Sequence, residues 1–214
     1  MLKKMNENKK LKIGMDIDDT IWKFNESFIN FLNFKNRTNY KIDNFEGSFE
    51  DLFNLSQDEI SVLLEEFEYS LEFGKFDLIE GVKEFLEELK QIHEIIFITA
   101  RSNKFEEITR KKLVEHFGEF DFPIHFLYDE NYNKLNSKAD LCIEHGVDYM
   151  IDDFLQNLLS CSNKGIKSFL LDRPWNQTEE LDENIIRVKE WNELLNKLNE
   201  LSELKDNVHS GEEK

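Results

Sequence analysis

Four carboxylates stand at two places in the chain where polar residues directly follow a short apolar run. Asp16 and Asp18 follow one run in the segment DIDDT, and Asp152 and Asp153 end another. Carboxylates brought together in a cleft repel one another, and a divalent cation relieves that repulsion at low cost. Oxygen donors without a neighbouring His or Cys favour Mg²⁺ over a softer metal. We therefore expect Asp16, Asp18, Asp152 and Asp153 to form a Mg²⁺ site.

A second set of residues could bind a phosphate group. Thr99 ends a further apolar run, and Ala100 follows it, so a hydroxyl and the next backbone N–H groups precede an expected helix. N–H groups at the start of a helix bind phosphate oxygens. Lys138 begins another expected helix and could supply a cation to a phosphate and to a carboxylate nucleophile. Lys134 is the alternative for this role, and we prefer Lys138 because it directly begins the helix.

Together these residues suggest phosphoryl transfer to a carboxylate. Asp16 would attack the phosphorus atom and form an aspartyl-phosphate, while Thr99, Lys138 and Mg²⁺ hold the phosphoryl oxygens. Asp18 would protonate the leaving alcohol and then activate water to hydrolyse the intermediate. The predicted reaction is the hydrolysis of a phosphate monoester.

Five short apolar runs are expected to be the strands that position these residues. They span residues 11–16, 94–99, 124–128, 147–152 and 166–171. Helical patterns lie between them, over residues 82–89, 105–117 and 137–145. This alternation predicts an α/β fold with a Rossmann-like, doubly wound parallel sheet. Ligands of such sheets bind at the carboxyl ends of the strands, where the predicted site residues would lie.

Residues 22–79 interrupt the alternation, and we expect them to form a small helical cap inserted after the first strand. An aromatic-rich helix begins at Trp22, and a capping box of Ser56 and Glu59 opens a second helix. The apolar face of this second helix would consist of Ile60, Leu63, Leu64, Phe67 and Leu71. The core would then comprise residues 1–21 and 80–204, followed by a disordered tail over residues 205–214.

The composition limits the classes of function. The 214 residues include 27 Lys and Arg against 45 Asp and Glu, a net charge of −18, and 40% are hydrophobic. Such acidity disfavours a nucleic-acid polymer or a membrane surface as partner and leaves a small phosphomonoester as the expected one. Two cysteines and the lack of an apolar stretch of signal or membrane-spanning length favour a cytoplasmic protein. A homodimer is left open.

The order of these motifs resembles that of the haloacid dehalogenase-like phosphohydrolases. DIDDT at residues 16–20, ITAR at 98–101, Lys138 and IDD at 151–153 are similar to the four motifs of that superfamily. Within it, the TARS segment, the place of the cap, and LDRPWN at 171–176 resemble the 5'(3')-deoxyribonucleotidase family and its bacterial nucleotidase-like relatives.

The resemblance implies a Rossmann-like core, bound Mg²⁺ and release of phosphate from deoxyribonucleoside monophosphates. It matches Asp16 to the nucleophile, Asp18 to the acid/base, Thr99 to the phosphate-binding threonine and Lys138 to the motif lysine. The metal would take Asp16, the backbone carbonyl of Asp18 and one residue of the acidic pair, with Asp152 preferred over Asp153.

We also predict roles for several other residues. Phe24 matches a position where the nucleotidases place an aromatic ring against the base, and such a ring stacks on any base. Asp19 stands where many relatives have Gly, and it is expected to point away from the metal. Arg101 could face the phosphate or cap a helix carboxylate, and Arg173 and Trp175 are expected to be structural.

We expect a Mg²⁺-dependent phosphomonoesterase that hydrolyses (deoxy)nucleoside monophosphates, a phosphoric monoester hydrolase of the 5'(3')-deoxyribonucleotidase type. Acidic residues outnumber basic ones in the cap, which disfavours di- and triphosphates. One alternative is a related phosphatase for another small phosphoester, such as a sugar phosphate. Another is a catalytically silent homologue that binds a nucleotide or a metal. The base, the sugar and the choice of 5' or 3' phosphate are left open.

Overall fold

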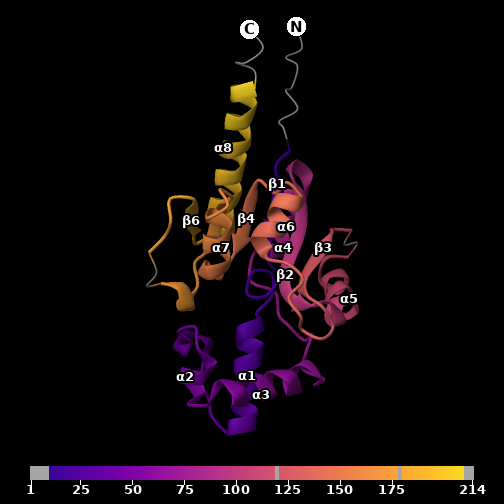
Figure 1. Cartoon of the computed structure of the whole chain (residues 1–214), viewed down its shortest axis with the longest axis vertical. Helices are drawn as coiled ribbons and strands as arrows, with labels where there is room; N and C mark the ends of the chain where they lie inside the picture. The colour runs from indigo at the N-terminus through magenta and orange to yellow at the C-terminus, as the bar shows by residue number, and fades with distance from the viewer. Residues whose placement is uncertain (1–9, 119–120, 178–179, 210–214) are drawn as a thin grey trace.

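A single parallel sheet forms the centre of the molecule (Figure 1). The computed structural model describes residues 10–118, 121–177 and 180–209, and the side chains as far as residue 202. Six strands lie in the order β3-β2-β1-β4-β5-β6, and every neighbouring pair is parallel. They are β1 Lys12–Met15, β2 Glu94–Ser102, β3 Ile124–Tyr128, β4 Tyr149–Asp152, β5 Lys167–Leu171 and β6 Ile185–Val188. The strand order reverses between β1 and β4, which confirms the predicted doubly wound α/β sheet.

Two elements of this sheet region depart from the sequence expectation. The edge strand β6 is not predicted, because its four residues include Arg187 and give only a short apolar signal. Strand β2 does not end at Thr99 but continues to Ser102, and its register with β3 shifts between these two residues. Three steps along β2, from Thr99 to Ser102, therefore match two steps along β3, from Phe126 to Tyr128.

Helices cover both faces of the sheet. On one face pack α4 (Val82–Ile92), α5 (Glu106–Phe117) and α8 (Trp191–His209), which share an apolar cluster with Ile13 and Met15. On the other lie α6 (Lys138–Glu144) and α7 (Leu155–Ser162), packed on Ile96, Ile98 and Met150. Helix α7 is not among the predicted elements. The two clusters are the two buried layers that a doubly wound sheet requires.

The segment inserted after β1, residues 22–79, forms helices beyond one end of the sheet, while α8 extends at the other end (Figure 1). We call it the inserted segment. It contains α1 (Phe24–Asn36), the 3₁₀ turn η1 (Ile42–Asn44), α2 (Phe49–Phe53) and α3 (Gln57–Glu68). The predicted capping box is present, because the Ser56 backbone N–H donates to Glu59 Oε2 at 2.8 Å and the Glu59 N–H donates to Ser56 Oγ at 3.3 Å. Leu71 differs from the expectation: it lies beyond the end of α3 and is 87% exposed.

The chain enters and leaves the inserted segment along two neighbouring stretches. Trp22 and Leu78 form an antiparallel bridge. The Lys23 N–H donates to the Asp77 carbonyl, and the Ile79 N–H donates to the Ile21 carbonyl, both at 2.9 Å. The division into a core and a cap of residues 22–79 stays a prediction, and this pairing of its two ends agrees with it.

The end of the chain differs from the sequence expectation. Helix α8 runs to His209, so residues 205–209 are helical where a disordered tail is predicted. The remainder of that tail, residues 210–214, lies outside the described residues, as do residues 1–9 of the predicted core. Across the described ranges, no helix combines the length and apolarity needed to cross a membrane.

Candidate active site

The carboxyl ends of β1 and β4 bring three buried carboxylates together. Asp16, Asp152 and Asp153 each place one carboxylate oxygen within 4.8 Å of the others. The Asp16 N–H donates to the Ile151 carbonyl at 3.0 Å, which ties the end of β1 to β4. Asp16 lies about 135 positions before the other two aspartates in the chain, and the three meet because β1 and β4 are neighbours in the sheet.

Lys138, the first residue of α6, contacts this cluster directly. Its Nζ lies 2.7 Å from Asp16 Oδ1 and 2.5 Å from Asp152 Oδ2, and the residue is 2% exposed. The Ser137 hydroxyl caps the helix by accepting from the Asp140 N–H at 3.1 Å, which fixes where Lys138 begins. Lys134 is exposed on the preceding loop. Of the two candidate lysines, the structure brings Lys138 to the carboxylates.

Burial and neighbouring charges shift the pKa values of the residues in this cluster. Burial raises the pKa of Asp16 well above its usual range, Asp152 and Asp153 raise it further, and Lys138 opposes them. Burial and the charge of Asp152 raise the pKa of Asp153 to about 7. Burial alone would lower the pKa of Lys138, but Asp152 and Asp16 outweigh it and raise that pKa. One ammonium group therefore faces three carboxylates, and the cluster lacks positive charge.

A divalent cation fits this donor set. Three carboxylates in contact offer hard oxygen ligands of the kind that Mg²⁺ takes. Asp16 Oδ1 is buried and at ion-pair distance from Lys138 Nζ, but the angles there do not make a hydrogen bond. A buried carboxylate oxygen without a hydrogen bond is costly, and a cation would satisfy it.

Asp152 and Asp153 differ in the hydrogen bonds that their carboxylate oxygens accept. Asp152 is fully buried, and its Oδ1 accepts from a backbone N–H at 2.9 Å. Its Oδ2 accepts from Lys138 and from Asn157 Nδ2, the latter at 3.0 Å. Asp153 accepts from Trp175 Nε1 at 2.9 Å and lines the adjacent cavity. This geometry favours Asp153 as the direct ligand, whereas the resemblance prefers Asp152.

Asp18 points away from the three carboxylates. Its Oδ2 accepts from Arg101 Nε at 2.8 Å, and its Oδ1 accepts from Arg101 Nη2 at 2.6 Å. Trp22 Nε1 also donates to Oδ1, at 2.8 Å. Arg101 therefore faces neither of its two expected partners, a phosphate or a helix carboxylate, but pairs with the carboxylate of the predicted acid/base.

Asp19 is not one of the three clustered carboxylates. Its φ of 53° lies in the left-handed region that favours glycine. Its carboxylate accepts from the Asn25 N–H at 3.1 and 3.2 Å in the first turn of α1. Burial and the nearby charge of Asp153 raise the pKa of Asp19 well above its usual range. Asp19 thus caps the first helix of the inserted segment.

A cavity of about 410 Å³ opens between the cluster and the inserted segment. The residues that line it on the side of the sheet include Asp16, Asp18, Asp153 and Ala100, together with Lys138 at the start of α6. Thr99 is fully buried, and its hydroxyl accepts from the Arg101 N–H at 3.2 Å. The residue that faces the cavity from this strand is therefore Ala100 rather than Thr99.

Aromatic side chains form the opposite wall of this cavity. Phe24, Phe45 and Phe49 contribute from the inserted segment, and Phe154 and Trp175 contribute from the loops after β4 and β5. The Phe45 ring lies 4.5 Å from that of Phe49 and 5.6 Å from that of Trp175, measured between centroids. The aromatic wall therefore joins residues of the inserted segment to residues of the loops after β4 and β5.

Phe24 belongs to this wall and to the interior of the inserted segment. Its ring centroid lies 6.3 Å from that of Phe28, 5.9 Å from that of Phe67 and 5.8 Å from that of Phe76. These contacts fix the ring from behind while one side faces the cavity.

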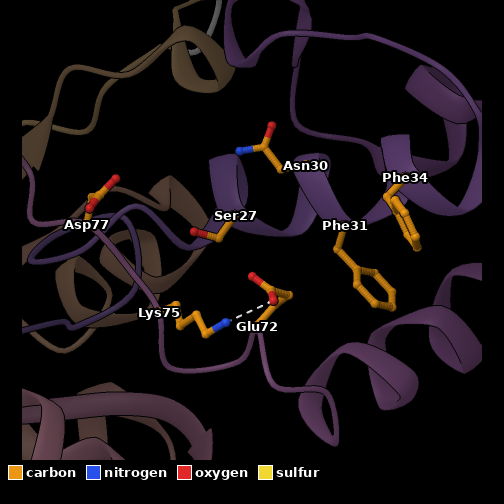
Figure 2. A pocket seen from close by; sticks show the side chains of 7 residues that line it. All are labelled: Ser27, Asn30, Phe31, Phe34, Glu72, Lys75 and Asp77. Carbon is orange, nitrogen blue, oxygen red and sulfur yellow. Dashed lines mark hydrogen bonds and ion pairs between the residues drawn. The ribbon is translucent and has the colours of Figure 1, made fainter.

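A second hollow lies on the inserted segment, with Phe31 and Phe34 on one side and Lys75 and Asp77 on the other (Figure 2). Lys75 Nζ pairs with Glu72 Oε1 there at 3.0 Å. None of the predicted site residues lines this hollow. The predicted residues thus meet only at the cavity beside the strand ends, among the residues described.

Comparisons with known proteins agree with this geometry. No family model matches the chain. The chain is similar to the protein named "Putative nucleotidase BH1399" from Halalkalibacterium halodurans, with 27% identity over 197 residues that cover 88% of this chain and 93% of that protein. Its sequence relatives thus include proteins named as nucleotidases.

Solved structures identify the fold. The haloacid dehalogenase-like hydrolase SP0104 from Streptococcus pneumoniae superposes with a TM-score of 0.62 at 19% identity, covering 87% of this chain and 97% of that one. The chain has the haloacid dehalogenase-like fold. A hydrolase of the same superfamily, YfnB from Bacillus subtilis in a magnesium-bound form, gives a TM-score of 0.55 at 16% identity, covering 89% and 99% of the two chains.

Several residues that complete this candidate site are absent from the sequence prediction. Asn157 contacts Asp152, and Phe45, Phe49 and Phe154 line the cavity. Trp175, expected to be structural, donates a hydrogen bond to Asp153. For Asn157 the sequence carries a signal, since it lies one helical turn after the IDD segment, whereas the aromatic residues give none beyond their type.

Proposed function

We propose that the protein is a Mg²⁺-dependent phosphomonoesterase that hydrolyses (deoxy)nucleoside monophosphates to nucleoside and phosphate. The observation that carries the proposal is the buried Lys138, whose ammonium group contacts Asp16 and Asp152 at the base of an aromatic-walled cavity. An ammonium group beside a carboxylate nucleophile can neutralise the phosphoryl oxygens that approach it. The nucleotidase name of a sequence relative supports the same activity.

The metal would be held by the side chains of Asp16 and Asp153 and by the backbone carbonyl of Asp18, with Asp152 behind them. When bound, Mg²⁺ supplies positive charge that offsets the repulsion between the carboxylates and the phosphate. Asp152 would act through Lys138, since its Oδ2 holds the ammonium group at 2.5 Å.

The residues of this chain would then carry out two chemical steps. An oxygen of Asp16 attacks phosphorus, the bond from phosphorus to the ester oxygen breaks, and an aspartyl-phosphate forms. Asp18 gives a proton to the departing alcohol oxygen in this first step. In the second step Asp18 takes a proton from water, the water oxygen attacks phosphorus, and Asp16 is released with inorganic phosphate. The backbone N–H of Ala100, with the Thr99 hydroxyl behind it, would orient the phosphoryl oxygens.

The aromatic wall favours a nucleoside as the leaving group. The rings of Phe24, Phe45 and Phe49 give a planar base an apolar surface, and stacking on such rings depends little on which base it is. A sugar phosphate would leave most of this wall in contact with polar hydroxyl groups. Lys138 supplies the lysine side chain among the residues that line the cavity, and its single positive charge suits a single phosphate group.

The test is release of inorganic phosphate from a panel of deoxynucleoside, ribonucleoside and sugar monophosphates, with Mg²⁺ and again with a chelator. We expect metal-dependent release that is fastest with the deoxynucleotides, and loss of that release in Asp16→Asn, which keeps the shape of the side chain but not its nucleophilic charge. A sugar phosphate that reacts at least about ten times faster would replace the nucleotidase assignment. Residual turnover by Asp16→Asn would contradict the covalent step.

A further inference from the structure

The guanidinium group of Arg101 is engaged on every nitrogen. Nε and Nη2 donate to the two oxygens of Asp18, at 2.8 and 2.6 Å, and Nη1 donates to Thr109 Oγ1 at 3.2 Å. The residue is 7% exposed. Two parallel hydrogen bonds of this kind fix the plane of a carboxylate as well as its position.

Aromatic rings hold the same guanidinium group in place. Its central carbon lies 4.7 Å from the ring centroid of Trp22, 5.1 Å from that of Phe76 and 5.3 Å from that of Phe73. Such stacking favours a cation over the ring faces. Trp22 and Phe76 flank the two stretches by which the chain enters and leaves the inserted segment, so Arg101 is held where the core meets that segment.

We propose that Arg101 is the positioning residue of Asp18, and that it sets the direction in which this carboxylate exchanges a proton with the substrate. The inference rests on the proposed function, in which Asp18 is the acid/base. The Asp18 side chain is 25% exposed and lines the cavity, so it stays within reach of a substrate while Arg101 holds it from behind. Lysine could not replace this function, because its ammonium group lacks the planar fork that binds both oxygens.

The leaving group reveals whether Arg101 acts through proton transfer. A nucleoside departs as an alcohol and needs a proton from Asp18, whereas p-nitrophenolate is stable enough to depart with little help. A misdirected Asp18 would therefore slow the first reaction far more than the second. An Arg101 that served the fold alone would affect both substrates equally.

The experiment compares kcat/KM for a deoxynucleoside monophosphate and for p-nitrophenyl phosphate in the wild type, Arg101→Gln and Arg101→Lys, all with saturating Mg²⁺. General acid catalysis contributes about 10²–10⁴-fold, so we expect the nucleotide value to fall at least about tenfold more than the p-nitrophenyl value. The matched control is Arg110→Gln, which removes an arginine paired with Glu106 at 2.8 Å within α5, is not among the residues that line the cavity, and should keep the ratio of the two values.

A second measurement tests the Arg101–Asp18 contact without turnover. Melting temperatures of Arg101→Lys, Asp18→Asn and the double variant, recorded without metal or substrate, form a double-mutant cycle. We expect the double variant to lose less than the sum of the two single losses, because both changes break the same contact. Additive losses would overturn the contact itself.

The outcomes separate this inference from the function on which it rests. Equal losses of kcat/KM on both substrates in the Arg101 variants would overturn the positioning role and leave the phosphatase assignment intact. If the wild-type protein releases phosphate from neither substrate, the proposed function fails and the positioning role fails with it.

Discussion

Lys138 is a buried ammonium group that is stabilised by two carboxylates and in turn holds them together. It lies within 2.7 Å of Asp16 and 2.5 Å of Asp152 and is almost fully removed from solvent. At this scale, function and stability depend on the same atoms, because a buried charge without its partner is strongly destabilising.

Removal of the ammonium group should destabilise the fold. Lys138→Met leaves Asp16 and Asp152 buried without their cation, and breaking a buried pair in this way costs about 3–5 kcal/mol. The free energy of unfolding, measured by urea titration in the absence of metal, reports this loss. Lys164→Met is the matched control, since Lys164 and Asp140 form a partly exposed pair whose loss should cost about 1 kcal/mol or less. Equal losses in the two variants would contradict the structural role of Lys138.

Replacement of the proposed acid/base should remove most of the turnover from a protein that still folds. Asp18→Asn keeps the shape of the side chain but cannot carry the proton, so we expect kcat for a nucleoside monophosphate to fall by about 10²–10⁴-fold. The measurement is steady-state phosphate release, with circular dichroism to verify the fold. A variant that keeps more than about a tenth of the wild-type kcat would rule out Asp18 as the proton carrier.

Three elements from the inserted segment and the sheet region meet through one set of side-chain contacts. Glu68 ends α3, Lys104 lies in the 3₁₀ turn Asn103–Phe105 after β2, and Tyr132 lies in the loop after β3. Lys104 Nζ is 3.5 Å from Glu68 Oε2 and 4.0 Å from the ring centroid of Tyr132, whose hydroxyl donates to Glu68. Asp129 shapes the loop by accepting from the N–H groups of residues 131 and 133. These contacts fasten the inserted segment to the sheet.

Loss of one hydroxyl should loosen this attachment. Tyr132→Phe keeps the ring over Lys104 but removes the hydrogen bond to Glu68, and we expect the free energy of unfolding to fall by about 1 kcal/mol. Amide hydrogen exchange should become faster in α3 than in β1 or β4. Tyr40→Phe is the matched control, because the Tyr40 ring packs on Phe53 within the inserted segment. Unchanged exchange in α3 would show that other contacts hold the segment in place.

At the scale of the whole molecule, a buried histidine joins three elements of the core. His93 follows α4, is 4% exposed, and accepts at Nδ1 from the Leu11 N–H at 3.4 Å. The backbone N–H of His93 donates to the Leu89 carbonyl at 2.8 Å. Burial lowers the pKa of His93 below its usual value, because the charged form would lose its hydration.

The stability of the core should therefore fall in mild acid. Above the unfolded pKa of about 6.5 the imidazole is neutral in both states, and below it the unfolded chain binds a proton that the folded chain does not. The free energy of unfolding should decrease as the pH falls from about 6.5 toward the folded pKa, in addition to contributions from other groups. His93→Asn keeps an acceptor but does not titrate, so its stability should depend less on pH in this window. Parallel curves for the wild type and the variant would contradict this role.

Features that depend on local pattern could be predicted from the sequence. The apolar runs that became β1 to β5, the capping box of Ser56 and Glu59, and the carboxylates that follow β1 and end β4 can be recognised from neighbouring residues. The periodicity of apolar side chains and the chemistry of caps act within a few residues, so they are visible without a fold. The short edge strand β6 gave too weak a pattern to be recognised.

Which of these residues meet depends on how the strands and helices pack. The parallel pairing of β1 with β4 and the start of α6 select Lys138 over Lys134, and the loop after β5 turns Trp175 onto Asp153. The pairing of Arg101 with Asp18 joins residues 83 positions apart, at the ends of the neighbouring strands β1 and β2. Contacts of this kind arise from the order and register of strands, which long-range packing sets and local sequence does not encode.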